Sequence, residues 1–352
     1  GYYVANISVG LGLHRLWAHG AYKANKYVEF ILALFAAGTL QGPALVWASD
    51  HYKHHTFTDK EGDPHSPLKY KSKWKGFFWS HIGWMIYGNG PSKQIDKITM
   101  KKLGSNKILR WQMKYYWQIA AFMNTILPIC VGYLFLPNLQ GILAGFVFIG
   151  IARALQQEMT FCVNSACHFL GSKKYANSTA GDIWWMFVFL LGENWHNFHH
   201  AFANDYRNGV KWYHFDVHKW LIAILEKLGL ATNLIRTPEV RIQAKIAATI
   251  QESAANARHN LSLIETAAIA IANAAQERIA QAEKSAEQFA VKARNAVIEL
   301  HEKATGLAQH ARELIESEKL SQKISIEYKK KLKKMQNMAK DLNLTLPQFN
   351  IL

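Results

Sequence analysis

Nine histidines form spaced groups whose residue type and spacing suit metal chemistry. Neutral imidazole is a strong nitrogen ligand for iron, zinc and copper. The repeated H-x-x-H-H pattern supplies more imidazoles than one metal ion needs. The sequence therefore predicts a two-metal site with these ligands: His14 and His19 in HRLWAH, His51, His54 and His55 in HYKHH, His168 in NSACH, and His196, His199 and His200 in HNFHH.

Helical spacing would aim most of these imidazoles in a common direction. His51, His54 and His55 stand at positions i, i+3 and i+4, so one helix face carries all three, and the last group repeats this spacing. His14 and His19 are five residues apart, which is about 140° around an α-helix. They therefore reach different metals or belong to a distorted turn.

Polar residues lie beside the histidines in the sequence. Hydrogen bonds from such residues commonly fix the orientation of a metal-bound imidazole. The alternative is ordinary solvated polarity at a membrane surface. The residues that we expect to orient imidazole N–H groups are Asp50, Asp63, Glu193, Asn194 and Asn197.

Two apolar segments are candidates for crossing a membrane, which takes about 20 mostly apolar residues. Trp117–Pro137 and Leu139–Leu155 meet or approach this length and are joined by a tight turn. They predict a transmembrane hairpin, with a buried helical pair in a soluble core as the alternative. Terminal Trp and Tyr residues and flanking Lys residues favour the membrane. A hairpin also returns the chain to the side where the histidines lie.

Two further apolar segments are not expected to cross. Val28–Trp47 is long enough, but a single crossing would separate His19 from His51 by roughly 30 Å. We therefore predict a helix along or under a cytosolic cap. Ile183–Leu191 is too short and suits a shallow interfacial element.

Composition changes near residue 237. Residues 1–237 contain all 12 Trp residues, whereas residues 238–352 are rich in the helix formers Ala, Gln, Glu and Lys. We predict an all-α protein: integral membrane helices with a histidine-rich di-metal cap, followed by a long Ala-rich helical or coiled-coil tail. A partly disordered tail is the alternative. Gly1 lies inside an apolar run without an initiator Met, which suggests a fragment that lacks an upstream membrane segment.

The charge distribution and the cysteine spacing limit the expected partners and cellular location. Much of the net charge of +16 comes from residues 69–114 and 329–334, as the positive-inside rule asks of cytoplasmic segments. We therefore expect no nucleic-acid partner, and a multi-pass membrane protein with its active site and tail on the cytoplasmic side. Cys130, Cys162 and Cys167 lack disulfide or zinc-ribbon spacing.

The motifs together carry a family resemblance. HRLWAH, DHYKHHTFTDKEGDPH, GFFWSHIGW, NSACH and GENWHNFHH, in this order, resemble the membrane-bound fatty acyl desaturases of the stearoyl-CoA or Δ9 type. The resemblance covers about residues 1–220 and does not reach the tail. It implies an oxygen-dependent enzyme of unsaturated fatty acid biosynthesis that places a cis double bond in a saturated acyl chain. It also implies two iron ions held by the nine histidines, with Asn164 acting through a water.

The substrate is expected to contact an acyl tunnel and a binding site for its carrier. Trp47 and Trp195 are candidates to line an acyl tunnel, although core packing is the alternative for each. Ser49-Asp50-His51 stands where animal acyl-CoA desaturases have Arg-Asp-His, Tyr87-Gly88-Asn89 replaces a basic pair, and Gly42-Pro43 lacks the family's Asn. CoA phosphates need Arg or Lys partners, so the carrier is CoA, acyl carrier protein or a lipid. Lys69, Lys71, Lys73 and Lys75 could substitute or simply follow the positive-inside rule.

Electrons are expected from a separate protein. The sequence lacks an HPGG cytochrome b5 signature, ferredoxin cysteine spacing and a G-x-G-x-x-G turn. The donor is then a cytochrome b5-like protein or a ferredoxin with its reductase. Two alternative hypotheses for the function are a hydroxylase of the same histidine-box superfamily and a metal-binding membrane scaffold.

Overall fold

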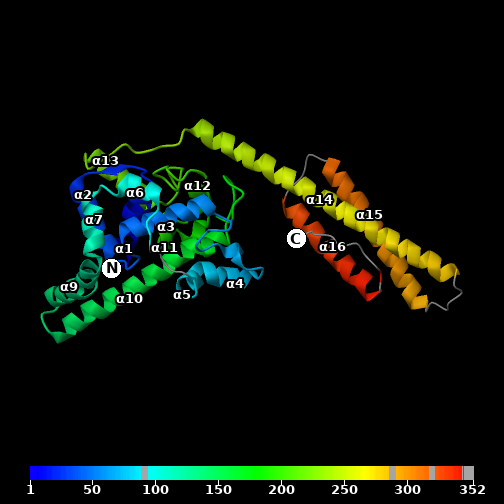
Figure 1. Ribbon diagram of the computed structural model, residues 1–352, viewed down its shortest axis with the longest axis horizontal. Coiled ribbons are helices and arrows are strands. Elements are labelled where there is room, and N and C mark those ends of the chain that lie inside the picture. The colour runs from blue at the N-terminus through cyan, green and yellow to red at the C-terminus, as the bar shows by residue number, and fades with distance from the viewer. Residues whose placement is uncertain (89–93, 285–290, 317–321, 343, 345–352) are drawn as a thin grey trace. The chain divides into compact units, whose positions relative to one another are not determined.

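A computed structural model describes residues 1–88, 94–284, 291–316, 322–342 and 344 (Figure 1). These residues are mostly helical, as predicted, with one short antiparallel pairing of β1 (Lys23–Ala24) and β2 (Ala231–Thr232). Contacts divide the chain into two compact units, Gly1–Ile246 and Ala247–Leu352.

The first unit consists of mostly short helices that surround the histidines, together with a helical hairpin. Residues 8–18 and 79–83 are π-helical (η1 and η3), and η4 widens the first hairpin arm. The helices are α1 (Tyr2–Ile7), η1 (Ser8–Ala18), α2 (Lys26–Ala37), α3 (Ala44–Phe57), η2 (Pro67–Lys69), α4 (Lys73–Phe78), η3 (Trp79–Gly83), α5 (Trp84–Ile86), α6 (Lys97–Leu103), α7 (Lys107–Lys114), α8 (Tyr116–Ala121), η4 (Phe122–Ile126), α9 (Leu127–Phe135), α10 (Leu139–Asn164), η5 (Ala166–His168), η6 (Trp184–Met186), α11 (Phe187–Leu190), α12 (His196–Ala201) and α13 (Val217–Lys227).

Two helical stretches among the described residues are long and apolar enough to cross a membrane, Tyr116–Phe135 and Leu139–His168. Only 22% and 17% of their apolar windows are buried, and Phe135 is 88% exposed. A helical pair in a soluble core would bury such side chains. Lipid is the surrounding that suits them, because the helices satisfy their own backbone hydrogen bonds.

These stretches correspond to the predicted hairpin, and the second arm is longer than Leu139–Leu155. The arms pack closely where glycines face each other. A Cβ on Gly132 would lie 2.1 Å from the carbonyl oxygen of Gly141, and one on Gly145 would lie 2.3 Å from that of Pro128. Small residues of this kind let two helices approach in lipid.

The segment Val28–Trp47 is two helices rather than the one helix that was predicted. α2 ends at Ala37 and α3 begins at Ala44. Between them Leu40 and Gly42 have φ angles of 59° and 92°, and Pro43 precedes α3. Left-handed residues and a proline end a helix. Both helices pack on η1, so the break brings α3 back beside the first histidine pair.

Two further segments belong to the first unit. η6 and α11 occupy the segment predicted to be interfacial, and Trp184 and Trp185 on it are exposed. The start of α14 (Glu239–Lys284) also belongs to this unit, because Ile242 is buried against Tyr175, Phe198 and Phe202. The unit therefore continues past the compositional change at residue 237.

The second unit is helical, as the Ala-rich composition predicts. It contains the rest of α14 with α15 (Val291–Glu316) and α16 (Gln322–Asp341). Small and branched apolar residues form its core, including Leu261, Ile264, Ile271, Leu300, Leu307 and Leu332. A coiled-coil arrangement stays a prediction.

Candidate metal centre

A π-helical turn aligns the first two histidines. The backbone N–H of His19 donates to the carbonyl oxygen of His14 at 3.1 Å, which is an i→i+5 bond. A widened turn of this kind brings residues five apart onto the same face, and such turns are frequent at functional sites. The distorted turn is thus the alternative that the structure adopts, and both rings reach one group of histidines.

The nine histidines meet as two neighbouring groups. One contains His14, His19, His51 and His199, whose ligand atoms all lie within 4.8 Å of one another. His55 adjoins it, with Nε2 2.9 Å from Nε2 of His199. The other group, within the same 4.8 Å limit, contains His54, His168, His196 and His200.

The donor atoms face one another through the same ring nitrogen. The Nε2 atoms of His19 and His51 are 2.8 Å apart, and those of His168 and His196 are 3.0 Å apart. A neutral imidazole carries one N–H, so rings that converge on Nε2 leave several lone pairs directed at each other. A cation at the centre of each group would accept these lone pairs.

Burial keeps these rings neutral. Removal from water, together with the smaller effect of the neighbouring His54, lowers the pKa of His196 to about 3. The same cause holds the pKa of five other rings well below the usual range: His19, His51, His55, His199 and His200. Their lone pairs are therefore available for metal binding at neutral pH.

Three of the nine histidines have a partner on the other ring nitrogen. Nδ1 of His14 lies 2.8 Å from Glu193, and Nδ1 of His54 lies 3.0 Å from Asp63. Nδ1 of His168 lies 2.7 Å from the Thr179 hydroxyl, which in turn donates to Asp59. A partner on Nδ1 leaves Nε2 as the metal-binding atom and fixes the plane of the ring.

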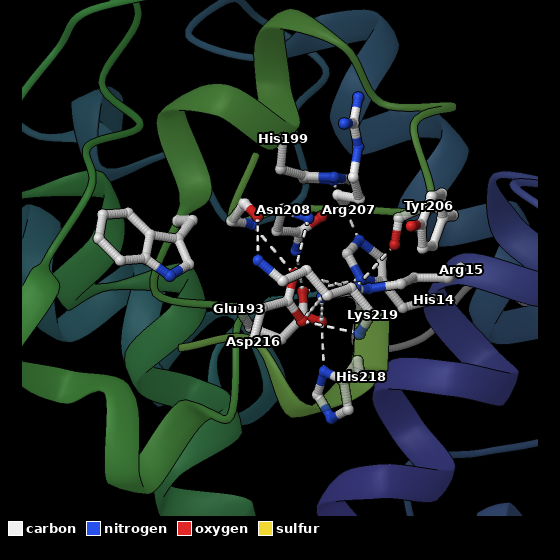
Figure 2. A network of polar contacts seen from close by, with 12 residues as sticks. His14, Arg15, Glu193, His199, Tyr206, Arg207, Asn208, Asp216, His218 and Lys219 are labelled. Carbon is white, nitrogen blue, oxygen red and sulfur yellow. Dashed lines mark hydrogen bonds and ion pairs between the residues drawn. The ribbon is translucent and has the colours of Figure 1, made fainter. Parts of the chain in front are cut away.

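Glu193 is the centre of a buried polar network (Figure 2). Besides His14, its carboxylate contacts Arg15 at 3.0 Å, His218 Nδ1 at 3.0 Å and the side-chain amide of Asn208 at 2.8 Å. Burial alone would raise the pKa of Glu193, but His14 and Arg15 hold it well below the usual range. Glu193 therefore stays ionised and orients His14.

The same network ties the first histidine pair to the segment after α12. Arg15 also contacts Asp216 at 3.0 Å and donates to the carbonyl oxygen of Tyr206 at 2.8 Å. Asp216 accepts the backbone N–H of Lys219 and so caps α13. Sequence reasoning missed Arg15, Asp216 and His218. In the sequence, these residues were marked only by their position, because Arg15 follows His14 and the other two lie at the start of α13.

The other residues predicted to orient imidazoles have different surroundings. Asp50 lies 3.6 Å from Lys53. Asn197 accepts the backbone N–H of Tyr175 and donates to the carbonyl oxygens of Ala176 and Ala180, so it anchors the loop that follows His168. The side chain of Asn194 is buried without a hydrogen-bond partner among the described residues.

A small cavity adjoins both histidine groups. Its wall includes His14 and His51 of one group and His54 and His196 of the other, and Asn164 and Trp47 also line it. Of the remaining lining residues, Val9, Gly10, Val163 and Leu190 are apolar or lack a side chain, and Asn6, Thr160 and Glu193 are polar.

The two tryptophans proposed for the tunnel differ in position. Trp47 is held at the wall, because its indole N–H donates to Gln41 at 3.2 Å and Gln41 donates to Thr160 at 3.3 Å. Trp195 is not among the described residues that line this cavity. Its ring stacks on His214 instead.

Residues 1–235 match the family model of the fatty acid desaturases. The chain belongs to this family. The resemblance inferred from the motifs is thereby confirmed, and the match extends beyond residue 220. In this desaturase the residues of α14 follow the end of the match.

Proteins with similar sequences are also named as desaturases. The desaturase is 36% identical over 247 residues to a probable acyl-CoA desaturase of Schizosaccharomyces pombe, covering 70% of this chain but only half of that protein. It is 34% identical over 252 residues to Delta-9 desaturase-like 5 protein of Arabidopsis thaliana, covering 70% of this chain and 78% of that protein. Delta-9 acyl-lipid desaturase 2 of the same plant is 33% identical over 235 residues, with coverage of 66% and 72%.

Proposed function

We propose that this chain is an oxygen-dependent di-iron desaturase that introduces a cis double bond, of the Δ9 type, into a saturated fatty acyl chain. The observation that carries the proposal is the contact between two all-histidine groups and one largely apolar cavity. In the overall reaction a –CH2–CH2– pair, O2, two electrons and two protons yield –CH=CH– and two waters. Two electrons enter from outside the chain.

Iron is the metal that fits the donors and the reaction together. Imidazole nitrogen suits iron, zinc and copper, but zinc has no redox chemistry. When bound, iron supplies the activation of O2 that an unactivated C–H bond requires. His14, His19, His51, His55 and His199 would hold one ion, and His54, His168, His196 and His200 the other. We assign Asn164 to the second ion through a water.

The protein's own part is to hold the chain and exclude water. An acyl chain bound in the cavity at the histidines would lie against both groups, and Trp47, fixed by Gln41, forms part of the cavity wall. A dry, shaped cavity limits attack to one carbon pair. Glu193 and Asp63 keep His14 and His54 in position while charge changes beside them.

The carrier of the acyl chain is proposed to be less strictly CoA than in the animal enzymes. Ser49 is fully buried and its hydroxyl accepts the backbone N–H of Asp96 at 2.9 Å, so it holds the start of α6. Tyr87 lines an open groove with Lys53, Lys60 and Lys69. The ammonium of Lys69 lies 3.1 Å from the centre of the Trp79 ring.

A carrier comparison tests this assignment. The same acyl chain is supplied on CoA, on acyl carrier protein and in phospholipid. Loss of one charge-assisted hydrogen bond weakens binding by about tenfold or more, so we expect CoA to be favoured by less than that factor. A strong CoA preference that disappears in the Lys69→Ala variant would instead identify the lysine loop as a replacement clamp.

The proposed setting is a multi-pass membrane protein with the metal centre and the tail on the cytoplasmic side. It is supported by the exposed apolar hairpin and by the excess of Lys in the loop before it. The donor is proposed to be a separate cytochrome b5-like protein or a ferredoxin with its reductase.

The decisive experiment is expression in a host that lacks its own desaturase, followed by mass spectrometry of the fatty acids. We expect new monounsaturated chains, and two iron atoms per protein after reconstitution. A hydroxylated product would assign the chain to hydroxylation. A single zinc ion without iron would remove the proposed chemistry.

A further inference from the structure

A row of aromatic rings runs from Trp195, the residue before His196, to the protein surface. Trp195 is joined by a peptide bond to His196, and its ring stacks on His214 with centroids 3.9 Å apart and planes 7° apart. The rings of His214 and Tyr213 follow at 5.1 Å, and those of Tyr213 and Trp212 at 5.7 Å. Trp212 is 85% exposed. The row therefore runs from solvent to the residue before a ligand histidine.

The inner part of the row is tightly held. The indole N–H of Trp195 donates to the carbonyl oxygen of Phe215 at 3.0 Å. Gly209 leaves no room for a side chain, because a Cβ there would lie 2.7 Å from Cβ of His214 and 3.0 Å from the Trp195 ring. The buried ammonium of Lys219 donates to the carbonyl oxygens of Gly209 and Lys211 and fixes the loop between them.

The exposed end of the row stands on a basic surface. Trp212 and Tyr213 border a hollow whose rim also carries Lys174, Arg207 and Lys211. The ammonium of Lys211 lies 5.6 Å from the Tyr213 ring. Glu239 is the one carboxylate among the residues that line the hollow, and Arg207 is paired with Asp205. The surface has an excess of positive charge around exposed aromatic rings.

We propose that this surface, formed by Lys174, Lys211, Trp212 and Tyr213, is the docking site of an acidic one-electron carrier protein. The inference rests on the proposed function, in which each double bond consumes two electrons from outside the chain. Each docking event oxidises the carrier by one electron and reduces the metal centre by one electron. Electron tunnelling weakens steeply with distance, so a short, packed route from the surface to His196 favours this face. Opposite charges steer the encounter.

A second exposed tryptophan provides a comparison. Trp74 lies among Lys73 and Lys75, and its ring is 5.9 Å from Phe169, which follows His168. Its surroundings differ, because the nearby Leu68, Phe78 and Leu170 are exposed and apolar. Mixed aromatic, apolar and Lys surfaces are typical of the membrane interface. We therefore assign Trp74 to lipid and Trp212 to the carrier.

The test compares two ways of supplying electrons to the iron-loaded full chain. One uses a [2Fe–2S] ferredoxin or cytochrome b5, each with its reductase, and the other uses dithionite in a single turnover. Lys174→Glu with Lys211→Glu should raise the apparent KM for the carrier about tenfold and reverse its salt dependence. Trp212→Ala should lower carrier-driven kcat. Dithionite-driven product per iron should stay that of the parent.

Controls separate docking from general damage. Lys101→Glu with Lys227→Glu makes the same charge change at exposed lysines elsewhere and should leave the carrier KM unchanged. Trp212→Phe should restore most of the kcat lost in Trp212→Ala. The docking proposal is overturned if the carrier KM does not move, if dithionite-driven product falls equally, or if Trp74→Ala has the larger effect on the carrier KM. A parent that works with dithionite but with neither carrier also overturns it. A parent without product under dithionite refutes the proposed function itself.

Discussion

The two units bury different kinds of side chain. In the first unit Arg15, Glu193 and Asp216 are almost completely buried together, next to imidazoles that converge on common points. In the second unit the core is made of Ala, Leu and Ile, and ion pairs such as Glu265 with Arg312 lie at the surface. Burying charge is costly unless every group is paired. In the first unit the buried charges therefore cost free energy of folding but fix the positions of the histidine rings. The second unit has the ordinary packing of amphipathic helices.

The histidines give the largest expected contrast between the units. His199→Ala should remove a ligand that lies within 3.0 Å of two other imidazole nitrogens and should abolish unsaturated product. His55→Ala should do the same. The matched control is His259→Ala, an exposed histidine of the tail, which should leave product and iron content unchanged. Product analysis and iron per chain are the measurements, and retained turnover without His199 would show that the ligand set is wrong.

The next largest effect is expected from low pH, which should destabilise the histidine-rich first unit. The lowered pKa of His51, His55 and His199 means that the folded unit keeps these rings neutral while the unfolded chain protonates them below about pH 6.5. Stability is then lost as pH falls below that value, by about 1.4 kcal/mol per pH unit for each ring. We expect the unfolding temperature of the metal-free protein, prepared with a chelator, to decrease as the pH is lowered from 7.5 to 5.5. A flat curve over this range would contradict the buried, neutral assignment.

Removing one carboxylate from each unit compares a buried with an exposed ion pair. Glu193→Ala removes one of the two carboxylates that contact the buried Arg15, and with it the partner of His14, and should cost about 3–5 kcal/mol, with loss of iron. Glu265→Ala removes the partner of Arg312, whose side chain is 65% exposed, and should cost about 1 kcal/mol or less. Thermal unfolding in detergent measures both. Equal losses would mean that the buried network contributes no more than a surface pair.

The junction of the units gives the smallest and most local test. Ile242→Ala empties a buried position against Phe198, which stands between two ligand histidines, and should cost about 2–4 kcal/mol. Ile250→Ala on the same helix is exposed and should change stability by about 0.5 kcal/mol or less. A chain that stops after Pro238 should keep measurable desaturation but less than one that stops after Glu252, because only the longer chain retains Ile242. Identical activity of the two truncations would show that α14 does not support α12.

Much of the site was accessible from residue spacing, and the exceptions have physical reasons. The i, i+3, i+4 pattern predicted shared faces for His51, His54 and His55, because helix geometry is local. The π-turn between His14 and His19 stayed one of two alternatives, since an extra residue in a turn is decided by packing. Asn197 was expected to orient an imidazole, but a short polar side chain binds whichever backbone group the fold presents, here Tyr175 and Ala176.

The sequence by itself determined the residue types that bind metal, the helical class of the chain, the apolar hairpin and the change of composition into the tail. These follow from side-chain chemistry and from periodicity within one segment. Only the tertiary structure decided which histidines meet, that Glu193 joins His14 to Arg15 and His218, that Trp195 turns toward His214, and that α14 begins inside the first unit. Each of these depends on contacts between residues far apart in the chain, often more than 150 positions, and no local pattern specifies them.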